Sequence, residues 1–188
     1  MKPISLFPSV SVLLLLFAAP LSFAEEGEAL AQTCVACHGV NGVSGAAIWP
    51  NLAGQKREYL LKEITAFRDG VRKEPTMQAF VKSLSDAQIA ALASYYSNME
   101  KPGKPIADEV NQAGMNVRAN CLSCHGVHGY TVNGLWPNLA GQKAQYLLKQ
   151  LQAFQQGTRQ SPIMNVIANE LNEQQMKDVA EYYSQQAY

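Results

Sequence analysis

The sequence predicts an all-α protein made of two similar domains in tandem, and three observations support this. First, residues 34–97 align without a gap on residues 121–184, an offset of 87 positions (121 − 34), and 30 of these 64 positions are identical. Second, apolar residues recur at helical spacing and no segment shows sustained strand alternation. Third, the Pro- and Gly-rich segment Lys101–Pro105 separates the copies. Two copies predict tandem domains rather than a solenoid.

The amino terminus has the features of a signal peptide. Lys2 precedes the apolar run Val12–Ala19, and Ser22-Phe23-Ala24 is a small-x-small cleavage site. The apolar stretch is marginal for a membrane-spanning helix, and prolines interrupt it. We therefore predict export, which in a bacterium means the periplasm. The predicted organisation is a signal peptide at 1–24, a domain at 25–100, a linker at 101–106 and a second domain at 107–188.

Helix signals occur at matched positions of the two copies. Helices are predicted over 26–33 and 108–120, and each runs into a cysteine motif. The next pair follows from apolar residues at i, i+4 and i+7, namely Leu60, Ile64 and Phe67, then Leu147, Leu151 and Phe154. The last pair begins at capping boxes, Ser85 with Gln88 and Asn172 with Gln175. Residues 39–53 and 126–140, rich in Gly, Pro and Asn, are predicted loops.

Composition excludes two classes of protein. Fifteen Lys and Arg balance fifteen Asp and Glu, so the net charge is +0 and no basic footprint for nucleic acid is present. Four cysteines in 188 residues are too few for a disulfide scaffold. Each predicted domain has only about 80 residues, a size that usually needs a metal, staple or cofactor to be stable.

The cysteines form two Cys-x-x-Cys-His motifs, which are typical of covalent haem c attachment. Cys34 and Cys37 precede His38, and Cys121 and Cys124 precede His125. Two thiols one helical turn apart can add to the haem vinyl groups, and the following histidine can then bind the iron. A zinc site, a redox-active thiol pair and two plain disulfides are the alternatives. The last two leave the histidines unexplained, and the wide separation of the pairs disfavours zinc.

Methionines are the candidates for the sixth iron ligand. His128 aligns with Asn41, so this histidine cannot serve both sites. Of the six methionines only Met77 and Met164 align with each other, and both lie two residues after a proline. Ligation by His and Met raises the reduction potential relative to two histidines, and it fills the sixth position. This pattern predicts an electron carrier rather than an enzyme.

Other repeated residues have two interpretations each. Trp49 and Trp136 either pack against the cofactor or fill the core. Arg72 and Arg159, the arginines shared by both copies, either pair with haem propionates or lie solvated on the surface. The Tyr95–Tyr96 pair and its copy Tyr182–Tyr183 are expected to pack between helices, and one hydroxyl could reach a propionate or the methionine sulfur.

With these motifs the chain resembles the cytochrome c4 family, the dihaem class I c-type cytochromes of bacteria. The shared features are the Cys-x-x-Cys-His pairs, Trp-Pro-Asn-Leu-Ala-Gly-Gln, Tyr-Leu-Leu-Lys and Pro-x-Met. The resemblance implies two all-α class I cytochrome c domains, each wrapped around a covalent haem c, that pack along their propionate edges about a pseudo-twofold axis. It also implies that the carbonyl groups of Pro50 and Pro137 accept hydrogen bonds from His38 and His125.

The function that this resemblance implies is periplasmic transfer of single electrons between respiratory partners. The expected partners are a bc-type complex and a haem–copper oxidase, with loose membrane association and no nucleic acid. The alternative is the dihaem cytochrome subunit of a larger redox enzyme, such as a flavocytochrome sulfide dehydrogenase. A third hypothesis, a dihaem peroxidase or thiosulfate-oxidising enzyme, needs an open iron site, and two equivalent Pro-x-Met segments argue against it.

Overall fold

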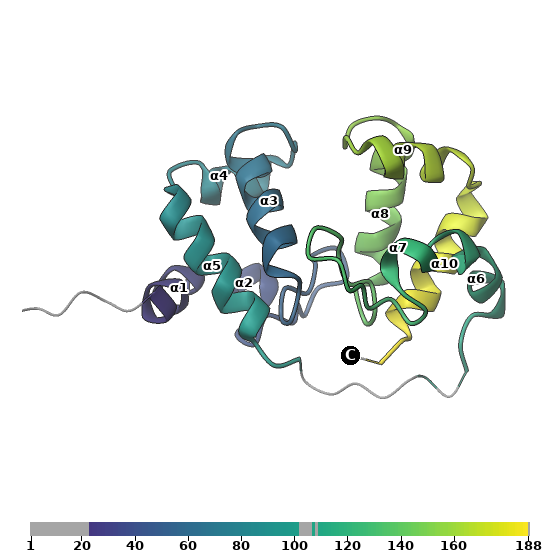
Figure 1. The fold of residues 1–188 in the computed structure, drawn as a ribbon, viewed down its shortest axis with the longest axis horizontal. Helices are drawn as coiled ribbons and strands as arrows, with labels where there is room; N and C mark the ends of the chain where they lie inside the picture. Colours follow the sequence, from purple (N-terminus) through teal and green to yellow (C-terminus); the bar gives the residue numbers. More distant parts are fainter. Residues whose placement is uncertain (1–22, 102–106, 108, 188) are drawn as a thin grey trace, which may run out of the picture.

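A computed structural model of the chain describes residues 23–101, 107 and 109–187 (Figure 1). The predicted signal peptide, apart from its last two residues, and most of the predicted linker lie outside the described residues. The described part is helical and contains no strand. Its helices are α1 (Phe23–Ala31), α2 (Val35–His38), α3 (Arg57–Arg68), α4 (Pro75–Val81), α5 (Asp86–Asn98), α6 (Gln112–Val117), a 3-10 turn (Arg118–Asn120), α7 (Leu122–His125), α8 (Ala144–Gln155), α9 (Pro162–Asn169) and α10 (Glu173–Ser184).

The two halves build the same domain twice. Helices α7 and α8 lie 87 positions after α2 and α3, and α9 and α10 follow α4 and α5 in the same way. In Figure 1 the first five helices form one lobe and the remaining helices form the other. This arrangement confirms the prediction of an all-α fold with two tandem domains.

The first and last helices of each domain cross closely because glycine lies at the crossing. A Cβ on Gly27 of α1 would lie 2.6 Å from the carbonyl oxygen of Ala91 in α5. A Cβ on Gly114 of α6 would lie 2.0 Å from the carbonyl oxygen of Asp178 in α10. Both distances are shorter than van der Waals contact, so only glycine permits this approach. The crossing holds the residues just before each cysteine motif against the domain core.

Each domain has a small apolar core beside this crossing. The buried residues of the first core are Ala31, Leu60, Leu92, Ala93 and Tyr96. Those of the second are Leu147, Val179, Ala180, Tyr182 and Tyr183. The predicted stripes along α3 and α8 therefore face these cores, and both predicted capping boxes are present at α5 and α10.

The structure differs from the predicted elements in three ways. The helix predicted over 26–33 begins earlier, at Phe23 within the predicted signal peptide, and ends at Ala31. The helix predicted over 108–120 begins only at Gln112, because the side chain of Asn111 caps it by accepting a hydrogen bond from Gly114 N–H at 2.7 Å. It also tightens into a 3-10 turn at Arg118. In addition, the methionine segments are helical: Pro75 and Pro162 open α4 and α9, a position that suits proline because its missing N–H has no helical partner.

Among the described residues, no helix is both long enough and apolar enough to cross a membrane.

Candidate functional site

One continuous cavity runs through both domains, and all of the predicted site residues line it. Its volume is about 1130 Å³, more than the roughly 300–1,000 Å³ of a typical small-molecule pocket. The site residues on its wall are Cys34, Cys37, His38 and Met77 from the first domain and Cys121, Cys124, His125 and Met164 from the second. The structure therefore brings together each set that the sequence predicted.

A single helical turn positions the two sulfur atoms of each motif. In the first domain, the N–H groups of Cys37 and His38 donate to the carbonyl oxygen of Cys34, at 3.2 and 2.9 Å. Residues at i and i+3 share one helix face, so both thiols face the same side. No disulfide joins any two of the four cysteines. No group of three or more His, Cys, Asp or Glu residues in the described ranges is arranged to hold a metal ion.

Each motif histidine is buried and held in one tautomer. His38 Nδ1 lies 2.9 Å from the carbonyl oxygen of Pro50, and His125 Nδ1 lies 2.9 Å from that of Pro137. A carbonyl oxygen only accepts, so Nδ1 carries the proton and Nε2 keeps its lone pair. Burial lowers the pKa of both histidines below the usual 6.5, and the carbonyl hydrogen bond offsets part of that effect. Both imidazoles are therefore neutral donors at pH 7, as metal ligation requires.

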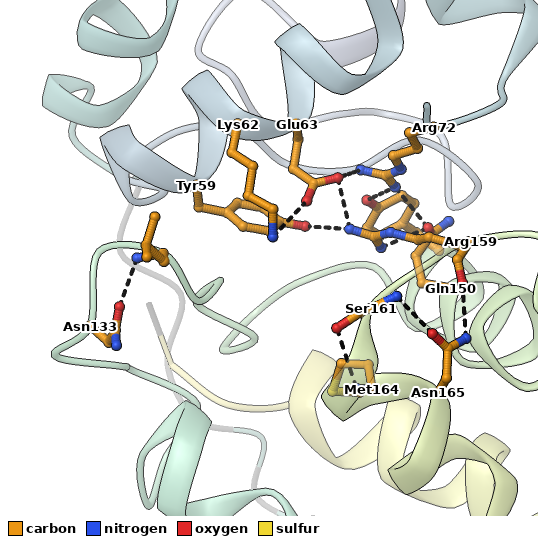
Figure 2. Close-up of polar contacts among 12 residues, drawn as sticks. Tyr59, Lys62, Glu63, Arg72, Asn133, Gln150, Arg159, Ser161, Met164 and Asn165 are labelled. Carbon is orange, nitrogen blue, oxygen red and sulfur yellow. Dashed lines mark hydrogen bonds and ion pairs between the residues drawn. The ribbon is translucent and has the colours of Figure 1, made fainter. Parts of the chain in front are cut away.

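The methionines reach the cavity from the short helices α4 and α9. Met77 and Met164 are both half-buried. Ser161 caps α9, and its hydroxyl accepts a hydrogen bond from the Met164 N–H at 3.3 Å (Figure 2). In Figure 1, α2, which ends at His38, lies near the start of α3, and α4, which contains Met77, lies beyond the end of α3.

The cavity wall fits a large, mostly apolar group in each half. Four large apolar side chains on the wall are about half exposed in the protein alone: Ile48 54%, Phe80 52%, Leu135 55% and Ile163 52%. The hydroxyl groups of Tyr96 and Tyr183 are buried on the same wall, near Cys34 and Cys121 respectively, and no described residue pairs with either hydroxyl within hydrogen-bond geometry. Buried polar groups are nearly always paired, so these hydroxyls indicate that a polar atom of the bound group completes the site.

The domains meet through a repeated pair of side chains. Asn51 N–H donates to Gln142 Oε1 at 2.8 Å, and Gln142 Nε2 donates to the Asn51 carbonyl oxygen at 2.9 Å. Asn138 and Gln55 make the same two bonds with the domains exchanged, at 2.8 and 3.0 Å. Asn51 contacts Gln142, and their copies in the other domain, Asn138 and Gln55, contact each other in the same way. This exchange is the mark of a twofold relation. The predicted pseudo-twofold packing is therefore present.

A buried charged cluster lies at the same boundary (Figure 2). Arg72 Nη1 lies 2.6 Å from Glu63 Oε2, and Arg159 Nη2 lies 2.9 Å from the same oxygen. Arg72 also donates to the Tyr146 hydroxyl, and Arg159 to the Tyr59 hydroxyl, each at 3.0 Å. Arg72 is only 9% exposed, which excludes the solvated alternative for this residue. Both guanidinium groups line the cavity, where a carboxylate-bearing ligand could meet them.

Sequence reasoning named the two arginines but missed the residues that join them across the boundary. The arginines are joined by Tyr59, Glu63, Tyr146 and Gln150. A separate set, which sequence reasoning also missed, joins the domains without touching the arginines: Asn51, Gln55, Asn138 and Gln142. The available signal was the unbroken identity of Trp-Pro-Asn-Leu-Ala-Gly-Gln in both copies, which includes polar residues that a domain core does not require.

Fold and site together define a c-type cytochrome with two haem domains, and comparison with known proteins agrees. The family model described as cytochrome c matches residues 24–100 and again residues 112–186. Cytochrome c4 of Pseudomonas aeruginosa is 34% identical over 173 residues, which cover 85% of this chain and 86% of that protein. A thiosulfate dehydrogenase electron acceptor from Thiomonas intermedia is 34% identical over 188 residues, 92% of this chain and 86% of that protein.

The likeness extends to a solved structure. The crystal structure of reduced recombinant cytochrome c4 from Pseudomonas stutzeri superimposes with a TM-score of 0.80 at 29% identity, covering 87% of this chain and 98% of that one. The chain belongs to the cytochrome c4 family. It carries two covalently bound haem c groups and acts as an electron carrier between redox proteins, not as an enzyme.

Proposed function

We propose that the four motif cysteines hold the two haems and that four cavity residues ligate the iron atoms. Cys34 and Cys37 form the thioethers of the first domain, with His38 and Met77 as axial ligands. Cys121, Cys124, His125 and Met164 do the same in the second. The observation that carries this proposal is the convergence of both complete sets on one cavity wall. The neutral Nε2 of each histidine and the soft thioether of each methionine are suitable donors to haem iron.

These residues determine the kind of chemistry available. The bound haem supplies a one-electron iron couple, whose potential depends on the axial ligands. The methionine sulfur favours ferrous iron, and the Pro50 and Pro137 carbonyl groups hold the imidazoles in the ligating tautomer. With protein ligands on both faces, no position is open for oxygen, peroxide or another substrate. The bound group would therefore supply outer-sphere electron transfer to a docked partner rather than chemistry on a substrate.

We also propose that the chain works in the periplasm, between respiratory partners. The segment 1–24 supports export, since it has an apolar run and a cleavage site. The proposed donor is a bc-type complex and the proposed acceptor is a haem–copper oxidase. These partners are the ones that the family resemblance implies.

A second candidate donor is a thiosulfate dehydrogenase. A relative that is 34% identical across most of this chain bears the name thiosulfate dehydrogenase electron acceptor. This candidate keeps the chain as an electron carrier and changes only the protein that reduces it. The alternative of a dihaem cytochrome subunit of a larger redox enzyme, such as a flavocytochrome sulfide dehydrogenase, is a separate hypothesis.

A redox titration followed by optical spectra tests the site assignment. Two haem c groups per chain, two resolvable potentials and the absorption band of methionine-ligated ferric iron are the expected results. A high-spin ferric spectrum in the resting protein would contradict the proposed ligation. A second measurement then ranks the two donors. It compares the rate at which a thiosulfate dehydrogenase with thiosulfate reduces the purified protein with the rate at which a bc-type complex with quinol does so.

A further inference from the structure

The charged cluster between the domains contains a closed ring of four hydrogen-bonded residues, in which two arginines alternate with two acceptor side chains. Arg72 bridges Glu63 and Gln150, at 2.6 Å to Glu63 Oε2 and 2.7 Å to Gln150 Oε1. Arg159 bridges the same two oxygens from the other domain, both at 2.9 Å. Figure 2 shows the two guanidinium groups side by side between these acceptors. Three of the four distances lie in the usual range of a charge-assisted hydrogen bond, and the contact between Arg72 and Glu63 is slightly shorter.

The ring is symmetric in position but not in charge. Glu63 and Gln150 occupy the same place in the repeat, 87 positions apart, as Arg72 and Arg159 do. One corner therefore holds a carboxylate and the opposite corner holds a neutral amide. The two arginines and the one carboxylate leave a net charge of +1 (2 − 1) in the ring. The single negative charge belongs to α3 of the first domain.

The ring is buried, so its charge acts over a distance. Glu63 and Arg72 are each 9% exposed, and the side chain of Arg159 is 11% exposed. Phe67 and Phe154 cover the outer faces of Arg72 and Arg159, at 4.4 and 4.5 Å from guanidinium carbon to ring centre. Water screens such charges poorly, and the four ring residues all line the shared cavity. Both iron sites therefore lie within the field of the ring.

We propose that Glu63 makes the potentials of the two iron sites unequal, by lowering the potential of the first domain relative to the second. This inference rests on the proposed function. A negative charge stabilises the ferric state, whose iron carries one more positive charge, and so lowers the potential. The carboxylate extends from the same helix that lines the first half of the cavity, whereas the second domain presents only the amide of Gln150 at that place. Electrons are thereby biased toward the second domain.

Three variants of the full, haem-loaded chain test this inference. Glu63→Gln removes the negative charge, and Gln150→Glu adds a second one. The double exchange combines both substitutions, so it moves the single negative charge to the other domain and leaves the net charge unchanged. Glu63→Gln should raise both potentials, the first-domain potential more. Gln150→Glu should lower both, the second-domain potential more. The double exchange should raise the first-domain potential relative to the second-domain potential. Parallel titrations in the Met77→His background assign each potential to its domain.

The double exchange keeps the inference testable even if Glu63→Gln loosens the domain contact, because it preserves the ring's net charge. An unchanged difference between the two potentials in the double exchange would overturn the inference, since a purely structural role does not depend on which corner carries the charge. Failure of the proposed function gives a different result, namely fewer than two haems per chain or no methionine-ligation band in the wild-type protein.

Discussion

Gln55 and Asn138, from different domains, exchange two hydrogen bonds through one side-chain amide. Gln55 Nε2 donates to the Asn138 carbonyl oxygen at 3.0 Å, and its Oε1 accepts from the Asn138 N–H at 2.8 Å. An amide side chain has one donor side and one acceptor side, so it can pair with a peptide group as another peptide would. Because both residues are buried, each lost bond leaves an unpaired polar group without water.

Removing this amide should therefore weaken the contact between the domains. Gln55→Ala leaves the Asn138 peptide unpaired, at a cost of about 1–3 kcal/mol, and adding Gln142→Ala should roughly double the loss. The measurement is denaturant unfolding of the holoprotein, with small-angle scattering to detect the separated domains. Gln174→Ala is a matched control, since Gln174 is an exposed glutamine on α10, and it should change stability by less than about 0.5 kcal/mol. An equal effect of both substitutions would contradict a role for Gln55 at the boundary.

The methionine assignment makes a prediction for each domain separately. Met77→His and Met164→His should each lower the potential of their own domain, on the order of 0.1–0.3 V within the roughly 0.8 V that axial ligands can span. The physical reason is that imidazole favours ferric iron more than a thioether does. Spectroelectrochemical titration resolves which potential moves. Met115→Leu, a change at a partly exposed methionine on α6, is the control and should move neither. If neither histidine variant shifts a potential, the ligand assignment is wrong.

The buried tyrosine hydroxyls test the fit of the cavity. Tyr96 is 2% exposed, and its hydroxyl has no hydrogen-bond partner among the described residues. Burial raises the pKa of Tyr96 well above its ordinary value, so the hydroxyl keeps its proton and can donate. If the bound haem supplies the acceptor, Tyr96→Phe should destabilise the holoprotein by about 1 kcal/mol.

The adjacent tyrosine provides the comparison for that measurement. Tyr95 packs edge-on against Tyr96, at 5.2 Å between ring centres, but is only partly buried. Tyr95→Phe should therefore leave the melting temperature of the holoprotein nearly unchanged. A holoprotein in which Tyr96→Phe is as stable as the wild type would show that the hydroxyl has no partner there.

The sequence was sufficient to predict the elements that have local signals. It was not sufficient where the same repeated residue could make its contacts either within its own domain or across the domain boundary. Capping boxes and apolar stripes located α3, α5, α8 and α10, and the cysteine spacing located both motif helices as attachment sites. It missed that Met77 lies within a helix, because α4 is short and only Pro75 marks its start. A residue repeated in both copies, such as Gln55, looks the same whether it packs within its domain or across the boundary. Only the assembled fold distinguishes the two cases.

Acid should weaken the domain contact through Glu63. Burial by itself would raise the pKa of this carboxyl, but Arg159, Arg72 and Lys62 together hold it below its usual 4.5. A carboxyl with a lowered pKa in the folded state contributes stability above the unfolded-state pKa. That contribution falls away as the pH drops through the folded-state pKa. At pH 7 the ionised carboxylate therefore stabilises the contact, and removing one partner of a buried ion pair costs about 3–5 kcal/mol.

The wild-type protein should accordingly exceed Glu63→Gln in free energy of unfolding at pH 7, and the gap should shrink steadily below about pH 4.5. The two proteins are compared at the same pH. The contributions of the other acidic groups to the free energy of unfolding then cancel, because those groups are the same in both proteins. Glu173→Gln is the control, because Glu173 is exposed and its ion pair with Lys177 lies within its own helix. Its stability difference should stay small at every pH. A wild-type advantage that persists undiminished in acid would mean that Glu63 stabilises the boundary by packing rather than by charge.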